Sequence, residues 1–410
     1  MYQEMKILIV SQFYYPERFS VDQVASQLVS LGHEVQVITG VPNYGFGRKL
    51  KEYKHVHDEV IDGVKVHRVN LFARKKTHLS VYLNYLSFWK NAKRYVGKIK
   101  EKFDVVLSFS LSPVISIAPA IKYAKKWNVP HVLMCEDLWP ESTVVTGAVR
   151  KNSLTYKILY KWSVSLYKNC DKILISSPSF EEYFKNELKI EDKKFVYINQ
   201  PILKSQKKLE PIVFSSKHNI VYAGNIGKLQ LTDKLLDAMK LLKDEDITLH
   251  LSGMGSELDH ILKRIREEDL IDKVKYNGAL PIEKCERYFY NADALIVALK
   301  SGGVVGKTIP NKAIQYMSYG KPILGIISGD GKDLLDNAKG TIFSSEDPKE
   351  IAKAIKEICS LEEKEKVRLG TNNKNYFETN LTTEKLAYLL SEELTDSIKW
   401  VIPSPWFLRP

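Results

Sequence analysis

Short apolar runs alternate with longer helix-like segments along most of this chain. In the first half, the runs lie at 6–10, 34–39, 64–69, 104–109, 131–136, 172–177 and 195–198. Segments with a helical pattern separate several of them, at 79–101, 113–127 and 151–169. Strands that alternate with helices are typical of a parallel sheet with helices on both faces. Residues 1–200 therefore predict an α/β, doubly wound, Rossmann-like domain.

The alternation is interrupted once and then begins again. Residues 201–217 contain proline, lysine and serine without periodicity, as linkers do. Apolar runs then recur at 219–224, 247–253, 273–278, 294–299 and 322–327. We predict a second Rossmann-like domain at 218–381, and a final helix and tail, 382–410, that pack back on the first domain. Two such sheets would face each other across a cleft, where the carboxyl ends of the strands bind ligands.

The net charge of +12 belongs entirely to the first half of the chain. Residues 1–205 contain 31 Lys and Arg but 19 Asp and Glu, whereas the remainder contains 30 of each kind. This asymmetry predicts an anionic partner for the first half: membrane lipid, an acidic substrate or nucleic acid. A lysine-rich surface without a partner is the alternative, but it would spread the charge over both halves.

Composition disfavours several other classes of protein. The four cysteines form no CxxC pair, and the nine histidines include no HxH or HExxH, so no metal site is expected. No stretch approaches the roughly 20 apolar residues that a membrane-spanning helix needs. The first apolar run is too short for the core of a signal peptide. These features predict a cytoplasmic protein.

Two glycine-containing loops in the second half could hold a phosphate group. In VYAGNIGK, Gly224 and Gly227 follow an apolar run and precede Lys228. In SGGVVGKTIPNK, glycines precede Lys307 and Lys312, and a proline begins a helix. Glycine lets backbone N–H groups approach an anion, and a helix N-terminus adds positive potential. Turns needed only for packing are the alternative. Neither loop matches GxxxxGKS, which disfavours a P-loop kinase or ATPase.

A series of longer segments carries a resemblance to a known family. They are FYYPE (13–17), LGHEVQVITGVPNYGFG (31–47), EDLWPES (136–142), YAGNIGK (222–228), SGMGSE (252–257), YNGALP (276–281), NADALIVAL (291–299) and IPNKAIQYMSYGKPIL (309–324). In these segments and in their order, the chain resembles the retaining GT-B fold glycosyltransferases of family 4. It is most similar to the bacterial branch that builds capsule and O-antigen repeat units, including transferases of acetamido sugars.

The resemblance implies a division of labour between the domains. The second domain would bind a nucleotide-diphosphate sugar, a UDP-sugar rather than a GDP-sugar, and the first would bind the acceptor. Transfer would proceed with retention and without a metal or another cofactor. The acceptor implied by this branch is a sugar linked to a polyprenyl diphosphate.

The donor motif departs from the family pattern. The family has two glutamates eight positions apart, which correspond here to Lys307 and Gln315. Gln315 can still hydrogen-bond a ribose, whereas Lys307 is better suited to phosphate or to a different sugar substituent. The family's Arg and Lys phosphate pair corresponds to Asn225 and Gln230, so lysines of the same two loops would supply the charge. The predicted donor-binding residues are Gly224, Asn225, Gly227, Lys228, Lys307, Asn311, Lys312 and Gln315.

The resemblance places the chemistry at EDLWPES in the first domain. Many family members have a histidine where Glu136 stands, and Asp137 begins the DLWP signature of the narrower branch. Either carboxylate could take the proton of the acceptor hydroxyl or stabilise positive charge on the donor sugar. We favour Asp137 as the catalytic residue and keep Glu136 as the alternative; both could instead only orient loops. The residues expected on the acceptor side are Arg18, Asn43, Tyr44 and Trp139.

Residues 71–102 combine nine Lys and Arg with one acid, Glu101, and with aromatic and aliphatic residues at helical spacing. A basic helix with an apolar face suits the surface of an anionic membrane. The alternative is that the apolar face covers the first sheet. Nucleic acid is disfavoured because no binding module accompanies the charge. We therefore expect peripheral contact with the inner face of the cytoplasmic membrane.

Two other functions stay open. A nucleotide-sugar epimerase of the same architecture would act on one sugar without an acceptor. A catalytically silent sugar-nucleotide-binding or scaffold subunit would explain why Lys307 and Gln315 replace glutamates. The sequence predicts neither the sugar nor the linkage.

Overall fold

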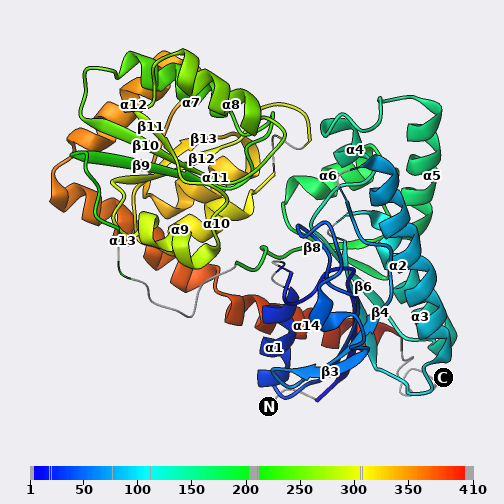
Figure 1. Ribbon diagram of the computed structural model, residues 1–410. Helices are drawn as coiled ribbons and strands as arrows, with labels where there is room; N and C mark the ends of the chain where they lie inside the picture. The colour runs from blue at the N-terminus through cyan, green and yellow to red at the C-terminus, as the bar shows by residue number, and fades with distance from the viewer. Residues whose placement is uncertain are drawn as a thin grey trace. The chain divides into compact units, whose positions relative to one another are not determined.

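The chain divides into two compact units, each built on its own sheet (Figure 1). The computed structural model describes residues 4–401 apart from 18, 20, 76, 111, 203–209, 211, 305 and 307. One unit comprises Met1–Pro201 with Thr383–Pro410, and the other comprises Ile202–Thr382. The repeated strand–helix pattern of the sequence thus corresponds to two separate α/β sheets, as predicted.

The first unit contains an eight-stranded sheet in the order β3-β4-β2-β1-β5-β6-β7-β8. Its strands are β1 (Lys6–Val10), β2 (Glu34–Gly40), β3 (Asp58–Ile61), β4 (Val64–Val69), β5 (Val105–Ser110), β6 (His131–Cys135), β7 (Lys172–Ile175) and β8 (Lys194–Tyr197). Neighbouring strands are parallel except β3, which runs antiparallel to β4 at one edge. The central strands β5 and β6 are buried along their whole length, as strands between two helical layers must be.

Helices cover both faces of the first sheet. They are α1 (Val21–Ser30), α2 (His78–Lys98), α3 (Ala118–Trp127), α4 (Glu141–Val145), α5 (Leu154–Lys168), α6 (Ser179–Asn186) and α14 (Thr383–Val401), with 3-10 turns η1 (Lys51–Tyr53) and η2 (Val114–Ile117). Leu390 of α14 shares a core cluster with Ile7, and Phe88 of α2 shares another with Leu8. Because successive strand residues point to opposite faces, α14 and α2 lie on opposite sides of the sheet.

The C-terminal helix α14 is held to the first unit by polar contacts as well as by its apolar face. The buried Lys172 Nζ lies 2.7 Å from Glu393 Oε2 and 3.3 Å from Asp396 Oδ2. His33 Nε2 lies 2.7 Å from Ser391 Oγ, and both side chains are buried. A buried cation needs such partners, so these contacts fix where α14 lies.

The second unit contains a six-stranded, wholly parallel sheet in the order β11-β10-β9-β12-β13-β14. Its strands are β9 (His218–Ala223), β10 (Ile247–Ser252), β11 (Val274–Tyr276), β12 (Ala294–Ala298), β13 (Ile323–Ile326) and β14 (Thr341–Phe343). Its helices are α7 (Thr232–Leu241), α8 (Leu258–Glu267), α9 (Ile282–Phe289), α10 (Asn311–Met317), α11 (Gly329–Ala338), α12 (Pro348–Ser360) and α13 (Glu363–Asn380).

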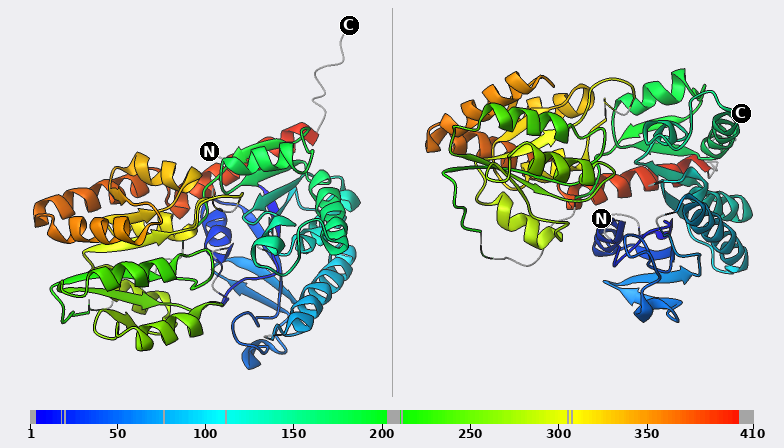
Figure 2. Two further views of the ribbon diagram at one scale, coloured as in Figure 1. Left: turned by 90° about the horizontal axis from the view of Figure 1, so that it is seen from above. Right: turned by 45° about the horizontal axis from the view of Figure 1, so that its top comes forward.

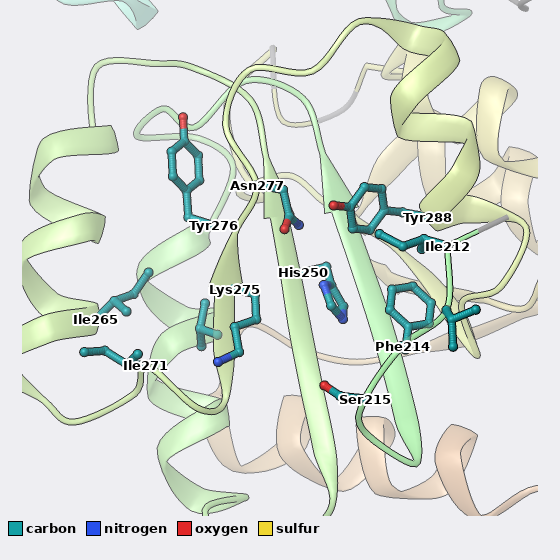
Figure 3. A pocket seen from close by; sticks show the side chains of 12 residues that line it. Ile212, Phe214, Ser215, His250, Ile265, Ile271, Lys275, Tyr276, Asn277 and Tyr288 are labelled. Atoms are coloured by element: carbon teal, nitrogen blue, oxygen red, sulfur yellow. The ribbon is translucent and has the colours of Figure 1, made fainter. Parts of the chain in front are cut away.

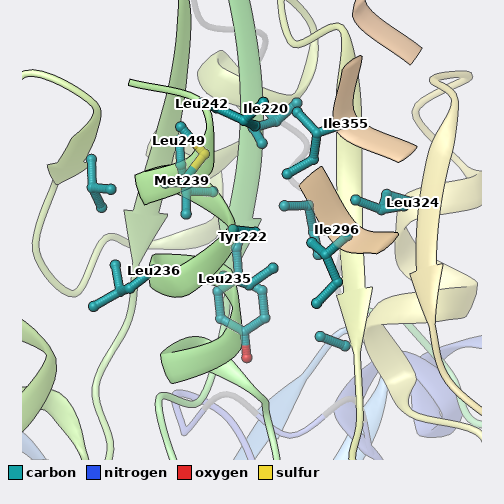
Figure 4. Close-up of a cluster of buried hydrophobic side chains, with 14 of the residues drawn as sticks. Ile220, Tyr222, Leu235, Leu236, Met239, Leu242, Leu249, Ile296, Leu324 and Ile355 are labelled. Atoms are coloured by element: carbon teal, nitrogen blue, oxygen red, sulfur yellow. The ribbon is translucent and has the colours of Figure 1, made fainter. Parts of the chain in front are cut away.

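One face of the second sheet packs against α7 and α12 around a fully buried core (Figure 4). Leu235 and Met239 of α7 and Ile355 of α12 meet strand residues such as Ile296 there. Tyr222 belongs to the same cluster, one residue before the end of β9. Its ring therefore lies at the boundary between the core and the loop that follows β9.

In both sheets the strand order reverses beside the first strand. Strands β2 and β5 flank β1, and strands β10 and β12 flank β9. Open α/β sheets bind ligands at such switch points, outside the carboxyl ends of the strands. The loops that follow β1 and β9 occupy this position in their respective units.

The sequence pattern misses the short edge elements. It does not predict β3 or β14, and it predicts one helix over 113–127 where η2 is followed by α3. A strand as short as β14, with three residues, is too short for a period-two pattern to identify. The proline at the second position of α3 begins a new helix there rather than continuing η2.

Candidate donor and catalytic sites

The loop after β9 lies directly against the loop after β10. Gly224 has φ +144° and Gly253 has φ +140°, backbone angles that residues with a side chain rarely adopt. A Cβ atom on Gly253 would lie 1.8 Å from the Gly224 carbonyl oxygen. On Gly255 it would lie 2.1 Å from the Ile226 oxygen. Glycines in SGMGSE are therefore needed so that the two backbones can touch, and the result is an exposed backbone turn at Gly224.

Lys312 points beneath this turn, and its ammonium group has no polar partner among the residues that the structure describes. The buried Nζ lies 3.8 Å from the centroid of the Tyr222 ring. A Cβ atom on Gly224 would lie 3.1 Å from the same nitrogen. Burial lowers the pKa of Lys312 to about 7. An ammonium compensated only by an aromatic face is costly to bury, so this is a place where an anion would be stabilised.

Helix α10 is fixed to the end of β9 by Tyr316. Its hydroxyl accepts a hydrogen bond from Ala223 N–H and donates one to Ala223 O, both at 2.9 Å. Gln315, on the same helix, donates to Tyr319 Oη at 3.5 Å, and Tyr319 donates to Glu286 Oε1 at 3.0 Å. Lys312 and Gln315 are three residues apart, so they share the face of α10 that Tyr316 orients.

The other predicted donor residues are placed less tightly. Lys228 is exposed, and it lies on the turn because α7 begins only at Thr232. Asn225 Nδ2 donates to Gln230 Oε1 at 3.1 Å, so the two residues at the family's basic positions bond each other. Asn311 is exposed at the start of α10, and Lys307 lies outside the described residues.

Glu346 is a residue of this region that sequence reasoning missed. Its Oε1 accepts a hydrogen bond from Ser301 N–H at 2.6 Å and so holds the start of the loop that leads to α10. Glu346 belongs to the loop after β14, 45 residues further along the chain than Ser301. Nothing in the local sequence around it indicates this contact.

A separate cavity of about 430 Å³ lies beside the edge strand β11 (Figure 3). Phe214, Tyr288 and His250 stand close together on one side of it, with ring centroids 4.5 to 6.0 Å apart. His250 Nδ1 and Asn277 Nδ2 are buried and have no partner among the described residues. Burial lowers the pKa of His250 to about 4, so the ring is neutral. Lys312 does not line this cavity.

In the first unit, Glu136 and Asp137 follow β6 directly, and both are half-buried. Burial and the adjacent Asp137 charge raise the pKa of Glu136 to about 8. Burial also raises the pKa of Asp137 to about 7, but Ser142, Leu138 N–H and other polar groups of the loop partly offset it. Carboxyl groups that titrate near neutrality are suited to proton transfer.

The surroundings of the two carboxylates differ in a way that revises our preference for Asp137. Polar groups surround Asp137, which suits a residue that orients the loop. Burial and the neighbouring Asp137 charge disfavour ionisation of Glu136, and no described residue donates a hydrogen bond to its carboxylate. We therefore favour Glu136 as the reactive group. Trp139 is held in place, since its Nε1 donates to Ser112 Oγ at 3.1 Å and its backbone N–H to Tyr167 Oη at 3.2 Å; its role on the acceptor side stays a prediction.

The structure contradicts the expectation that Asn43 lines the acceptor side. Asn43 is fully buried, and its Oδ1 accepts hydrogen bonds from Asn84 Nδ2 and Arg74 N–H, both at 2.9 Å. Glu17 Oε1 accepts from the N–H groups of Asn43 and Tyr44 at 2.7 and 2.6 Å. Asn43 therefore supports the loop, while Tyr44 remains 40% exposed. Arg18 lies outside the described residues.

Arg74 is the charged residue that these contacts bring to Tyr44. Its guanidinium lies 5.0 Å from the centroid of the Tyr44 ring, and Nη1 donates to Tyr85 Oη at 2.8 Å. The sequence signal was only the basic cluster ARKK, which marks charge without showing which member faces the loop. Within the described residues, no group of histidine, cysteine or carboxylate side chains could hold a metal ion.

Comparison with known proteins identifies the class to which this fold and these loops belong. Residues 19–202 match the family described as Glycosyltransferase Family 4, and residues 205–376 match Glycosyl transferases group 1. The Probable glycosyltransferase WbjE of Pseudomonas aeruginosa is 26% identical over 274 residues, which cover 63% of this chain and 67% of that protein.

Solved structures share the fold over nearly the whole chain. Sucrose-phosphate synthase from Thermosynechococcus elongatus has a TM-score of 0.75 at 15% identity and covers 97% of this chain and 100% of its own. Anabaena HepE, in complex with UDP and glucose, has a TM-score of 0.67 at 12% identity and covers 96% of this chain and 100% of its own. WaaG, a glycosyltransferase involved in lipopolysaccharide biosynthesis, has a TM-score of 0.65 at 12% identity, with 95% and 100% covered.

The two α/β units with their parallel sheets thus form the GT-B fold. The chain carries a family 4 domain followed by a group 1 domain, and these matches support its identification as a GT-B glycosyltransferase.

Proposed function

We infer that this enzyme is a retaining glycosyltransferase that moves an acetamido sugar from a UDP-sugar to a lipid-linked or saccharide acceptor, in the synthesis of a bacterial surface polysaccharide. One observation carries the inference most directly. The ammonium group of Lys312 is buried beneath the backbone turn at Gly224, and among the described residues its one neighbouring partner is the Tyr222 ring. A diphosphate would supply the missing negative charge, and the exposed turn would let it approach the backbone closely.

The residues of the donor loops divide the proposed work. Lys312 and Lys228 would bind the diphosphate, and Gln315 would hydrogen-bond the ribose through its amide. The exposed turn at Gly224 would admit the phosphate oxygens. The proposal requires no bound metal or organic cofactor, because the positive charges of the lysines would neutralise the negative charge of the diphosphate.

The proposed chemistry lies with the carboxylates that follow β6. When the donor sugar leaves its diphosphate, positive charge develops on the sugar, and the acceptor hydroxyl must lose a proton. An ionised Glu136 could accept that proton or stabilise that charge, and Asp137 would hold the loop and tune the pKa of Glu136. Retention of configuration is carried over from the family and stays part of the proposal.

The exposed apolar face of α2 supports peripheral contact with a membrane. Leu79, Tyr82, Leu83 and Leu86 are between 38% and 69% exposed, while Phe88 of the same helix faces the core. The apolar side chains predicted to contact lipid are therefore not the ones that cover the sheet. No described helix is long and apolar enough to cross a membrane. A basic helix with an unburied apolar face suits the interface of an anionic bilayer.

Replacing Leu79 by glutamine should weaken binding to anionic vesicles about three- to tenfold, because partial burial of one leucine in lipid contributes on the order of 1 kcal/mol. Vesicle sedimentation with the full chain measures this change. Val60→Gln is the matched control, since Val60 on β3 is 70% exposed and Leu79 is 69% exposed. Equal losses in both variants would show that α2 has no special role.

The function itself is tested by incubating the full-length protein with UDP- and GDP-sugars and a bacterial lipid extract. We expect release of UDP from one acetamido-sugar donor, and this release should depend on the extract. Conversion of the donor sugar without an acceptor would indicate an epimerase. Binding without release, across all donors, would replace the enzyme with a silent sugar-nucleotide-binding subunit.

A further inference from the structure

A basic cavity of about 470 Å³ lies in the first unit, beside α2. Three pieces of chain form its walls: the loop after β2, the segment after β4, and one side of α2. The lining residues are Lys49, Asn70, Leu71, Phe72, Ala73, Lys75, Ser87 and Asn91. Both charged members of this set are lysines, so the cavity offers positive charge and no carboxylate.

The two lysines lack a counter-ion within the described part of the chain. Lys49 Nζ donates to Asn70 Oδ1 at 2.6 Å, a neutral acceptor that leaves the positive charge uncompensated. Neither Lys49 nor Lys75 forms an ion pair with a described carboxylate. Burial and the nearby charge of Lys54 lower the pKa of Lys49. An anion in the cavity would offset both effects.

The wall that α2 contributes is held in place by hydrogen bonds. Ser87 Oγ accepts from Phe72 N–H at 2.7 Å, and Asn91 Nδ2 donates to Asn70 O at 2.6 Å. These bonds fasten the segment after β4 to the helix, so the cavity is already formed without a ligand. A preformed site binds with less loss of conformational entropy than one that must order itself.

The position of the cavity on α2 indicates the source of the anion. Leu83, Ser87 and Asn91 are spaced by four residues and therefore follow one another along one side of the helix. Leu83 is 38% exposed and Phe72 is 44% exposed, so apolar surface borders the basic cavity. Phosphate flanked by hydrocarbon is the chemistry of a phospholipid headgroup.

We propose that this cavity binds the phosphate group of an anionic membrane lipid, with Phe72 and Leu83 against the adjoining hydrocarbon. The proposal deepens the membrane contact inferred above and depends on it. The cavity is distinct from the diphosphate site proposed at Lys312 in the second unit, since none of its lining residues belongs to that unit. It predicts recognition of the phosphate group in addition to general attraction of a basic surface.

The first experiment measures binding of monomeric dihexanoylphosphatidylglycerol and of inorganic phosphate to the full-length protein by calorimetry. We expect Lys49→Gln and Lys75→Gln each to raise the dissociation constant of the lipid at least fivefold. Lys90→Gln and Lys98→Gln, which remove the same charge from α2 outside the cavity, should change it twofold or less. Equal effects in all four variants would overturn the proposal, because they would show only surface electrostatics.

The source of the phosphate is distinguished by two further arms. Vesicles containing phosphatidylglycerol are compared with vesicles brought to the same surface charge with oleate, and preference for the phospholipid is expected. Binding of inorganic phosphate with loss in Lys49→Gln, but no preference for the phospholipid, would keep the phosphate site and assign it to a free anion. No binding of either probe would overturn the site. All arms omit the sugar donor, so they do not depend on whether the enzyme transfers sugar.

α2 also has a neighbour that extends the apolar surface. Leu154, Ile158 and Trp162 of α5 are spaced by four residues and are 77%, 45% and 52% exposed. Helices α2 and α5 both contact η2, and they lie on the same side of the first unit in Figures 1 and 2. In the vesicle arms, Trp162→Gln should therefore weaken binding without altering the preference for phosphate.

Discussion

Lys312→Met should make the protein without bound donor more stable and should also weaken donor binding, an unusual pair of effects for one substitution. The ammonium group is buried without a polar partner among the described residues, and such a group costs about 1 to 3 kcal/mol. Methionine has a similar length and no charge, so the free energy of unfolding of the second unit should rise. Urea unfolding of wild type and variant measures this gain.

The same substitution should raise the dissociation constant of UDP about 10- to 100-fold, because a hydrogen bond to a charged group contributes about 1.5 to 3 kcal/mol. Calorimetric titration with UDP is the measurement. Lys228→Met is the matched control: Lys228 is exposed, so its loss should leave stability within about 0.5 kcal/mol and weaken UDP binding by only a few-fold. Loss of stability with unchanged UDP affinity would make Lys312 a packing residue.

The pH dependence of Lys312 follows from the sign of its shift. Its pKa of about 7 in the folded protein lies below the ordinary value of 10.5. The destabilisation is therefore fully present below pH 7, where Lys312 is charged in both the folded and the unfolded chain. It declines as the pH rises above 7, because the folded protein releases the proton first, and it disappears near pH 10.5, where the unfolded chain releases its proton as well. The stability gained in Lys312→Met should be largest below pH 7 and should shrink above it. Since a diphosphate favours the charged lysine, UDP binding at pH 8 should take up a proton, which calorimetry in two buffers detects.

Glu136→Gln should lower the turnover number by about 10²- to 10⁴-fold, the range typical of a lost general acid or base. Glutamine keeps the shape of the side chain but cannot accept a proton or carry negative charge. The Michaelis constant for the donor should change little, because the carboxylate follows β6 in the first unit and the donor loops belong to the second. Steady-state release of UDP measures both constants.

The pH profile separates the roles of the two carboxylates. The wild-type rate should rise with pH between 7 and 8, as the pair loses its shared protons. Asp137→Asn removes the negative charge that raises the pKa of Glu136, so the rising limb should move to lower pH. Glu136→Gln should retain only a residual rate without that limb. If Asp137→Asn abolishes the limb and Glu136→Gln only moves it, Asp137 is the reactive group after all.

The two sheets could be predicted from the sequence because their signal is local. A buried strand such as VVLSFS is marked by neighbouring apolar residues, and each predicted run is complete within seven positions. The turn at Gly224 and Gly227 could also be predicted, but not that Gly224 meets Gly253 of the segment SGMGSE. That they touch each other depends on the parallel pairing of β9 with β10, which brings together residues 29 positions apart in the chain.

The candidate site was predicted unevenly for the same reason. Lys312 was marked by its glycine-rich loop, but its burial over the Tyr222 ring depends on a residue 90 positions away. Asn43 was expected on the acceptor side, whereas its hydrogen bonds with Asn84 and Glu17 hold it in the interior. A polar residue after a strand can line a ligand site or satisfy a neighbour, and the local sequence is the same in both cases.

The sequence by itself determined most of the elements, the two-domain order and the resemblance to GT-B glycosyltransferases, because hydrophobic periodicity and glycine turns are properties of neighbouring residues. Only the tertiary structure decided which charged groups lack a partner among the described residues. The sequence marked Lys312 by its loop but did not show its burial, and Lys49 and Lys75 are ordinary lysines in the sequence. They become candidate anion sites because distant segments bury or surround them and no carboxylate of a described residue pairs with them. Electrostatic energy depends on distance in space rather than along the chain.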